Sequence, residues 1–288
     1  MLFLFISICC SVTVAVLLKL ARRYKMNVIQ AVTWNYLFAI GLSWFFFRPS
    51  LTELTRSDTP PLYLFLGILL PVVFWLLAAS VRNIGMVKTD IAQRLSLFIP
   101  ILAAYFIFKE HFNVWKVAGV ATGFVAIFFT LYKKSNQQDS SKNWLYPLLV
   151  FIGFGTIDIL FKQVAQLRQI PYTSSLVLIF IISFVISLIC VLYMAVVKKQ
   201  KLELINFICG CILGFFNFGN ILFYMKAHRA MSESPTVVFA AMNMGVIIFG
   251  SLVGIVIFRE KFNKLNYIGL SLALAAIILI TISFYHAF

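Results

Sequence analysis

Two acid–base pairs at helical spacing are the residues of this sequence best suited to chemistry. Asp158 stands four positions before Lys162, and Asp90 stands four positions before Arg94, all within largely apolar surroundings. Residues four apart share one face of an α-helix, so each carboxylate can pair with its cation. For Asp158 two interpretations follow: a neutralised ion pair with Lys162, or a carboxylate that binds a proton or another coupling cation.

Three further groups could bind an anion. Arg94 carries a planar fork suited to a carboxylate or phosphate, so contact with a substrate anion is the alternative to its internal pair. Gln93 stands beside it. Lys19 has no acidic partner four residues before it, since Ala15 occupies that place, and it either reaches the membrane surface or contacts a solute. We predict Arg94, Gln93, Lys19 and Lys162 as contacts of an anionic or zwitterionic solute.

Amide side chains within apolar runs are a third group of candidates. Hydrogen bonds between helices, of about 1 kcal/mol each, are the more frequent reason for such residues. If several converge on one cavity, they describe a polar solute site instead. The candidates for that site are Asn35, Asn217, Asn220 and Asn243, with Trp34 and Tyr224 as aromatic walls.

The elements that must position these residues are long apolar runs. The 288 residues are 62% hydrophobic and 11% charged, and the mean hydropathy is +0.99. A helix needs about 20 apolar residues to cross a bilayer core. The runs lack the alternation of barrel strands, so we predict an all-α polytopic membrane protein with ten transmembrane helices. They cover about 2–20, 28–47, 62–82, 89–108, 113–132, 144–166, 172–197, 204–226, 234–258 and 263–285.

The net charge of +15 is spread through the connectors, which indicates membrane orientation and no nucleic-acid partner. Alternate connectors, beginning with the one after the first run, hold 16 of the 24 Lys and Arg residues. This count places those connectors in the cytoplasm and both termini outside. The five cysteines fall in apolar runs without metal-ligand companions, so we expect packing roles, no metal and no cofactor.

One motif occurs twice, 150 residues apart. Residues 107–119 read IFKEHFNVWKVAG, and residues 257–269 read IFREKFNKLNYIG. A second similarity between the halves is that of TVAVLLK at 13–19 to TIDILFK at 156–162. The chain therefore divides into a five-helix repeat at 1–134, a linker at 135–143 and a second five-helix repeat at 144–288. Because five is odd, the second repeat enters the membrane from the opposite side, and the repeats are inverted.

The repeated turn has a structural interpretation and a gating one. Glu110 and Glu260 stand three residues before Asn113 and Asn263, and the two Asn side chains suit the N-caps of the following helices. We expect these four residues to hold the two turns. The small-residue pairs Gly119/Gly123, Gly250/Gly254 and Gly269/Ala273 indicate close helix packing.

These features resemble the drug/metabolite transporter (DMT) superfamily, and within it the EamA-type transporters. The segment Gly155–Lys162 is similar to that family's WG…K motif, and Phe108–Gly119 and Phe258–Gly269 are similar to its Glu-containing turn. The first repeat departs from the motif, with Ser11-Val12 where the family has Trp-Gly. The resemblance covers nearly the whole chain and implies a ten-helix exporter, in a family often drawn with both termini inside.

The predicted function is transport of a small polar metabolite, such as an amino acid or another anionic or zwitterionic solute, by alternating access. Export is the expected direction, with a proton or sodium as coupling ion, from a monomer or weak homodimer in the inner or plasma membrane. A flippase of a lipid or lipid-linked sugar is the alternative. An integral-membrane enzyme is disfavoured, because the sequence has no DDxxD, HExxH or Gly-rich phosphate loop and His111, His228 and His286 are isolated.

Overall fold

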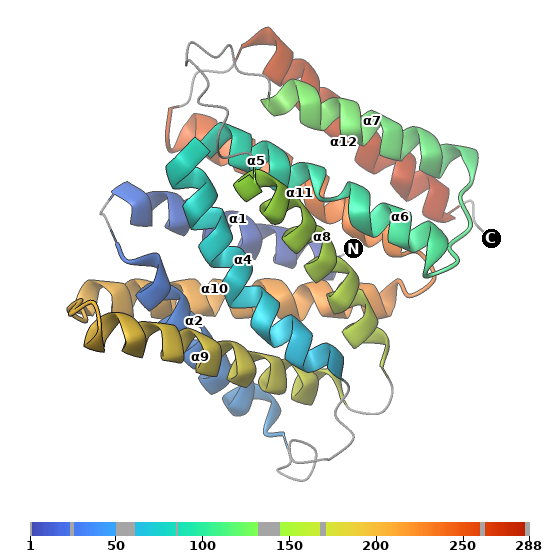
Figure 1. Cartoon of the computed structure of the whole chain (residues 1–288). Helices are drawn as coiled ribbons and strands as arrows, with labels where there is room; N and C mark the ends of the chain where they lie inside the picture. Colours follow the sequence, from blue (N-terminus) through green and yellow to red (C-terminus); the bar gives the residue numbers. More distant parts are fainter. Residues whose placement is uncertain are drawn as a thin grey trace.

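The computed structural model describes residues 2–23, 26–49, 61–84, 86–131, 145–167, 171–259 and 263–285, and all of its regular elements there are helices (Figure 1). They are α1 (Leu2–Arg23), α2 (Val28–Phe47), α4 (Pro61–Ile84), α5 (Met86–Leu95), α6 (Phe98–Phe106), α7 (Val114–Leu131), α8 (Leu145–Gln166), α9 (Tyr172–Val196), α10 (Leu204–Ala230), α11 (Pro235–Val256) and α12 (Lys264–Tyr285).

Most of these helices are built to cross a bilayer. Seven are long and apolar enough to span it by length and composition, and α1 and α7 contain shorter apolar stretches. Their outward faces expose large apolar side chains, among them Phe45 at 73% and Phe128 at 66%. Lipid solvates such side chains, which water would not. The all-α polytopic prediction is confirmed, and α5 and α6 together take the place of the fourth predicted helix.

The single helix predicted at 89–108 is wrong, because the chain breaks between α5 and α6. Pro100 has no backbone N–H and cannot donate to the carbonyl of Ser96. Around the break, the amide of Leu97 bonds the carbonyl of Arg94 at 3.3 Å, and that of Ile99 bonds Ser96 at 3.0 Å, as in a tighter 3₁₀ turn. Gly155 of α8 lies against this break, where a β-carbon would come within 2.6 Å of Ile99.

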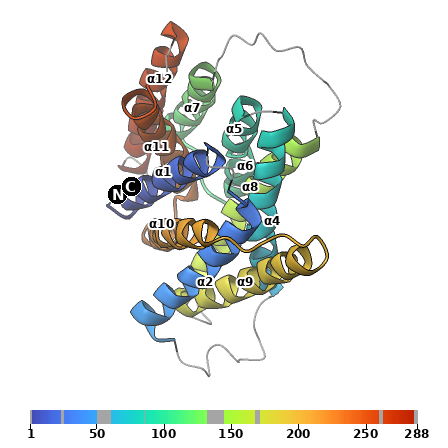
Figure 2. The same cartoon turned by 90° about the vertical axis from the view of Figure 1, so that its left-hand side faces the viewer.

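Packing between the repeats follows a reciprocal pattern. In the first repeat α1 and α2 pack on α10 of the second, and in the second repeat α8 and α9 pack on α4 of the first. The pairs α2–α9 and α7–α12 join equivalent helices and lie at opposite edges of the bundle (Figure 2). This exchange is what a pseudo-twofold axis between the repeats produces, and the inverted-repeat prediction is confirmed.

The α7–α12 pair shows the inversion at the level of single hydrogen bonds. Asn113 caps α7 by accepting the amide of Lys116 at 2.8 Å, and Asn263 caps α12 by accepting the amide of Asn266 at 2.8 Å. Both predicted caps are confirmed. The Asn113 amide also donates to the carbonyl of Ser283, near the end of α12. The start of α7 therefore meets the end of α12, so the two equivalent helices are antiparallel.

Small residues bring these two helices together. A β-carbon on Gly119 would lie 2.5 Å from Ile280, and one on Gly269 would clash with Thr130. Ala273 is fully buried. The packing role predicted for these positions is confirmed, whereas Gly250 has nothing within 4 Å of a built β-carbon and its prediction is wrong.

Three predicted features lie outside the described residues. They are the linker at 135–143, Glu260 of the second turn, and the side chain of Lys19, whose backbone belongs to α1.

The inverted arrangement predicts opposite labelling of two exposed positions. In a cysteine-free background, His111→Cys lies in the α6–α7 turn and Lys198→Cys lies between α9 and α10. The charge distribution places Lys198 in the cytoplasm and His111 outside. A membrane-impermeant maleimide on intact cells should therefore modify only His111→Cys. Modification of both positions from the same face would contradict the topology.

Candidate functional site

The carboxylate of Asp158 is bound by a tyrosine from a neighbouring helix. The hydroxyl of Tyr224, on α10, donates to Oδ1 of Asp158, on α8, at 2.9 Å. Asp158 is the 14th of the 22 residues of α8, so it lies well inside the membrane-spanning segment. Tyr224 is buried at 5% exposure, whereas Asp158 keeps partial access to its surroundings. A half-exposed carboxylate with one neutral donor can still accept a cation or a proton.

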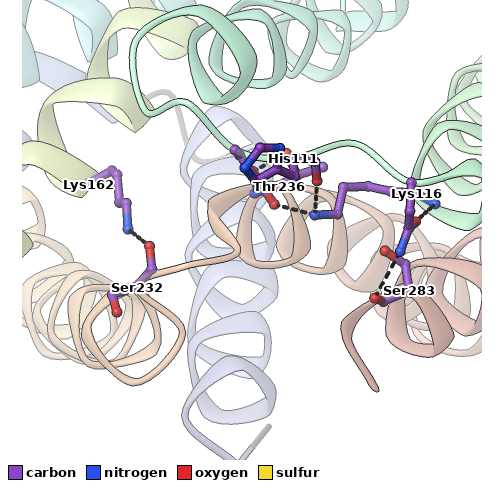
Figure 3. Close-up of polar contacts among 8 residues, drawn as sticks. His111, Lys116, Lys162, Ser232, Thr236 and Ser283 are labelled. Carbon is purple, nitrogen blue, oxygen red and sulfur yellow. Dashed lines mark hydrogen bonds and ion pairs between the residues drawn. The ribbon is translucent and has the colours of Figure 1, made fainter. Parts of the chain in front are cut away.

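The predicted Asp158–Lys162 ion pair is wrong. The ammonium of Lys162 donates to the backbone carbonyl of Ser232 at 2.7 Å, and it lies 5.8 Å from the centre of the Phe108 ring (Figure 3). Lys162 is completely buried. The spacing placed both residues on one helix face, but α10 supplies Tyr224 to the acid, and the turn before α11 supplies the carbonyl to the base.

The second pair, Asp90–Arg94, is present as predicted. Nε of Arg94 lies 3.2 Å from Oδ2 of Asp90, and both side chains remain partly exposed, at 18% and 35%. They belong to α5, which packs on α8. Gln93 is half-buried, and its carbonyl accepts the hydroxyl of Ser96 at 2.5 Å. A solute at this place could bind the guanidinium of Arg94, which has N–H donors that the pair with Asp90 does not use.

The amide candidates divide between two environments. Asn220 accepts the hydroxyl of Ser7 at 2.8 Å and so ties α10 to α1, while Asn243 donates to Phe239 of its own helix at 3.0 Å. Asn35 and Asn217 are buried between packed helices, and polar atoms of both have no hydrogen-bond partner within the described ranges of the chain. The structure therefore gives Asn220 and Asn243 partial exposure and Asn35 and Asn217 almost none.

Trp34 belongs to an apolar groove. Its indole packs edge-on against Phe207 at 5.0 Å, and the groove between α2 and α10 has a volume of about 230 Å³. The groove is lined by Trp34, Leu37, Phe38, Gly41, Leu42, Phe207 and Cys211. None of these side chains is charged, so the groove suits an apolar group and not the polar solute for which Trp34 was a candidate.

A buried ion pair, Glu110–Lys116, lies where the α6–α7 turn packs on the start of α11 (Figure 3). Oε1 of Glu110 lies 2.8 Å from the ammonium of Lys116, and its Oε2 accepts the amide of Thr236 at 2.9 Å and the hydroxyl of the same residue at 2.6 Å. Both charged side chains are at most 3% exposed. Thr236 stands in the first turn of α11, whose own N-cap, Ser234, makes no side-chain cap bond.

Glu110, which belongs to the α6–α7 turn of the first repeat, thus caps α11 of the second repeat. A carboxylate at a helix N-terminus satisfies a free amide and interacts favourably with the helix dipole. The structural interpretation of Glu110, which holds the turn, agrees with these contacts.

Comparison with known proteins gives this architecture a family. The sequence model of the EamA-like transporter family matches residues 1–132 and 141–282. The chain belongs to the EamA-like transporter family. An uncharacterized protein of Haemophilus influenzae is 41% identical over 284 residues, which cover 95% of this chain and 95% of that protein. A protein of known crystal structure superposes with a TM-score of 0.72 at 14% identity, covering 99% of this chain and 97% of that one, and shows a common fold.

This EamA-like protein is therefore a multi-pass membrane protein, and its family is one of transporters, which agrees with the expectation that it is not an enzyme. Among the described residues, no three His, Cys, Asp or Glu side chains gather in a way that could hold a metal ion.

Sequence reasoning missed four residues that the EamA-like fold brings into these contacts. They are Ser7, Lys116, His228 and Thr236. A signal existed for Lys116, which stands where the second repeat has Asn266, so the two turns differ in charge. A signal also existed for His228, which stands four residues after Tyr224 on the same helix. Thr236 gave none, because only the packing of the α6–α7 turn on the start of α11 places it beside Glu110.

The Glu110–Lys116 pair predicts a stability defect that a second substitution repairs in part. Glu110→Gln should lower the free energy of unfolding by about 3–5 kcal/mol, because it leaves the buried Lys116 ammonium without a counter-charge. The double variant Glu110→Gln/Lys116→Met should recover part of the loss. Thermal unfolding in detergent measures both. Equal melting temperatures for the parent and Glu110→Gln would show that the pair is not a structural requirement.

Proposed function

We propose that this protein exports a small polar metabolite, either an amino acid or another anionic or zwitterionic solute, by alternating access across the inner or plasma membrane. The observation that carries the proposal is the Asp158–Tyr224 contact, which places an ionisable group well inside a spanning helix. Ionisable residues at such depth are costly and mark solute or ion pathways.

Further support comes from polar residues on several helices. Gln93 and Arg94 on α5, Asp158 on α8, Asn220 on α10 and Asn243 on α11 all keep partial exposure. They are contributed by the fourth helix of the first repeat and by three helices of the second. Substrate sites of inverted-repeat transporters lie near the membrane midplane between the repeats, where such side chains converge. Arg94 then receives a substrate anion, and the amides orient its polar groups.

Asp158 is the coupling residue in this proposal. A proton or sodium ion that binds its carboxylate removes the negative charge, and a change of partner from Tyr224 to that ion links binding to the transport cycle. The protein works as a monomer or weak homodimer, with lipid around its exposed apolar faces. No cofactor takes part.

A flippase of a lipid or lipid-linked sugar is the second candidate, and the apolar groove between α2 and α10 favours it. An acyl chain would suit this groove, because its lining is apolar. The groove does not require Asp158, Arg94 or the amides of α10 and α11, whereas the export proposal uses all of them.

Asp158→Asn should abolish gradient-driven accumulation of the solute in proteoliposomes, because an amide cannot be protonated or bind a cation in the same way. Tyr224→Phe should reduce accumulation without abolishing it, since only one hydrogen bond is lost. The measurement is uptake of labelled amino acids and other metabolites with and without a pH or sodium gradient.

Glu203→Gln is the matched control, since this carboxylate is exposed at the start of α10. It should transport like the parent. If Asp158→Asn accumulated solute as strongly as the parent under the same gradient, Asp158 would not be the coupling residue. If labelled phospholipid crossed the bilayer and no metabolite did, the flippase would replace the exporter.

A further inference from the structure

A second polar cluster lies between α8 and α10, one helical turn beyond the Asp158–Tyr224 contact. Lys162 and His228 stand four residues after Asp158 and Tyr224 on the same two helices. Both side chains are completely buried, at 0% exposure. α8 ends four residues after Lys162, and α10 ends two residues after His228. Both helices end on the side of the bundle where the chain termini lie (Figure 1).

Lys162 has no direct counter-ion among the described residues. Its ammonium donates to the carbonyl of Ser232, which uses one of three available donors. The carboxylates of Glu110 and Glu233 act on it electrostatically, but from beyond ion-pair distance. The oxygens of Glu110 are already bonded by Lys116 and Thr236. A buried cation in this position is incompletely neutralised.

His228 is more unusual, because neither of its ring nitrogens has a hydrogen-bond partner among the residues that the structure describes. The ring is held by aromatic contacts, with Tyr224 at 4.6 Å and Phe239 at 4.8 Å between ring centres. Lys162 stands on α8, which packs on α10, and the Asp158–Tyr224 bond joins the two helices four residues earlier. A buried polar group without a partner is rare in a folded protein and indicates a missing ligand or water.

The free donors of Lys162 and the ring N–H of His228 require an acceptor, and a negative one would neutralise Lys162. We propose that Lys162 and His228 form a subsite for the carboxylate of the transported solute, in which the Ser232 carbonyl occupies the place of one carboxylate oxygen in the conformation of this structure. This rests on the export function proposed above and specifies its substrate class as carboxylate-bearing. A carboxylate offers two acceptor oxygens, one for each residue, and supplies the missing charge.

Binding at this subsite also frees the turn that begins α11. When the solute carboxylate replaces the Ser232 carbonyl, this turn loses its bond to Lys162 and keeps the longer one from the Gln166 amide at 3.4 Å, while α11 keeps its bonds to Glu110. The solute therefore stabilises a conformation in which the turn has moved. A ligand shifts a conformational equilibrium by its difference in affinity for the two states, and the exchanged hydrogen bond provides that difference.

The test compares matched solutes in proteoliposomes that contain the full chain. The probes are labelled alanine, threonine and succinate against alaninamide, threoninamide and succinamide. The parent should accumulate the carboxylates at least roughly tenfold over the amides, because a site built for a charged group rejects an analogue without it. Lys162→Met should reduce this preference to near unity, and His228→Phe should weaken it, whereas His228→Gln, which keeps an N–H donor, should restore most of it.

Lys226→Met is the matched control, because among the described residues that ammonium lies over the rings of Phe3 and Phe223 and bonds no other group. This variant should leave the preference unchanged. Thermal unfolding identifies variants that fail to fold; if Lys162→Met is one of them, the His228→Phe and His228→Gln comparison decides. Transport of amides as fast as carboxylates by the parent would overturn the subsite and leave the export function standing. A parent inactive toward every probe would contradict the export function and the subsite together.

Discussion

The structure depends on the exchange of helices between its repeats. Each repeat packs its first two helices chiefly on the third helix of the other repeat, and to a lesser extent on its own, where α2 meets α4 and α8 meets α10. Glycines permit the close approach, as at Gly210 and Gly214 of α10, where a β-carbon would lie within 2.7 Å of α2. Association in lipid relies on such packing, because hydrocarbon is no less apolar than the side chains. The pseudo-twofold relation is thus a requirement of packing. Both polar clusters, Asp158–Tyr224 and Lys162–His228, form where the exchanged helix α8 meets α10.

The sequence predicted the helices well, because an apolar run of membrane length has few alternatives. The Asn caps were also predictable, since Asn113 and Asn263 stand in repeated turns. The break between α5 and α6 was not. Pro100 indicated a bend, but the position of the break at Ser96 and Leu97 depends on a side-chain bond to Gln93 and on Gly155 of another helix. Contacts of this kind come from the tertiary fold and leave no local pattern.

The candidate site shows the same limit more sharply. The four-residue spacing correctly placed Asp90 beside Arg94, and no described side chain of a neighbouring helix bonds to either. The same spacing failed for Asp158 and Lys162, because Tyr224 and the Ser232 carbonyl are nearer partners in three dimensions. An i,i+4 pair contributes only about 0.2–0.5 kcal/mol on an isolated helix, so better-placed groups from other helices readily displace it. Sequence spacing shows which residues could pair, and the packing of the helices decides which pairs form.

The ion pair of Glu110 and Lys116 has a consequence for how a duplicated protein acquires direction. At the position equivalent to Lys116 the second repeat has Asn266, whose amide binds the carbonyls of Phe129 and Thr130. One end of the α7–α12 pair thus includes a buried charge pair, and the other is joined by neutral hydrogen bonds. Under the alternating access proposed above, two ends with unequal bonding open at unequal energetic cost, so the inward-open and outward-open forms differ in population. Because of this difference in population, the resting protein is open mainly to one side of the membrane, although its two repeats share one architecture.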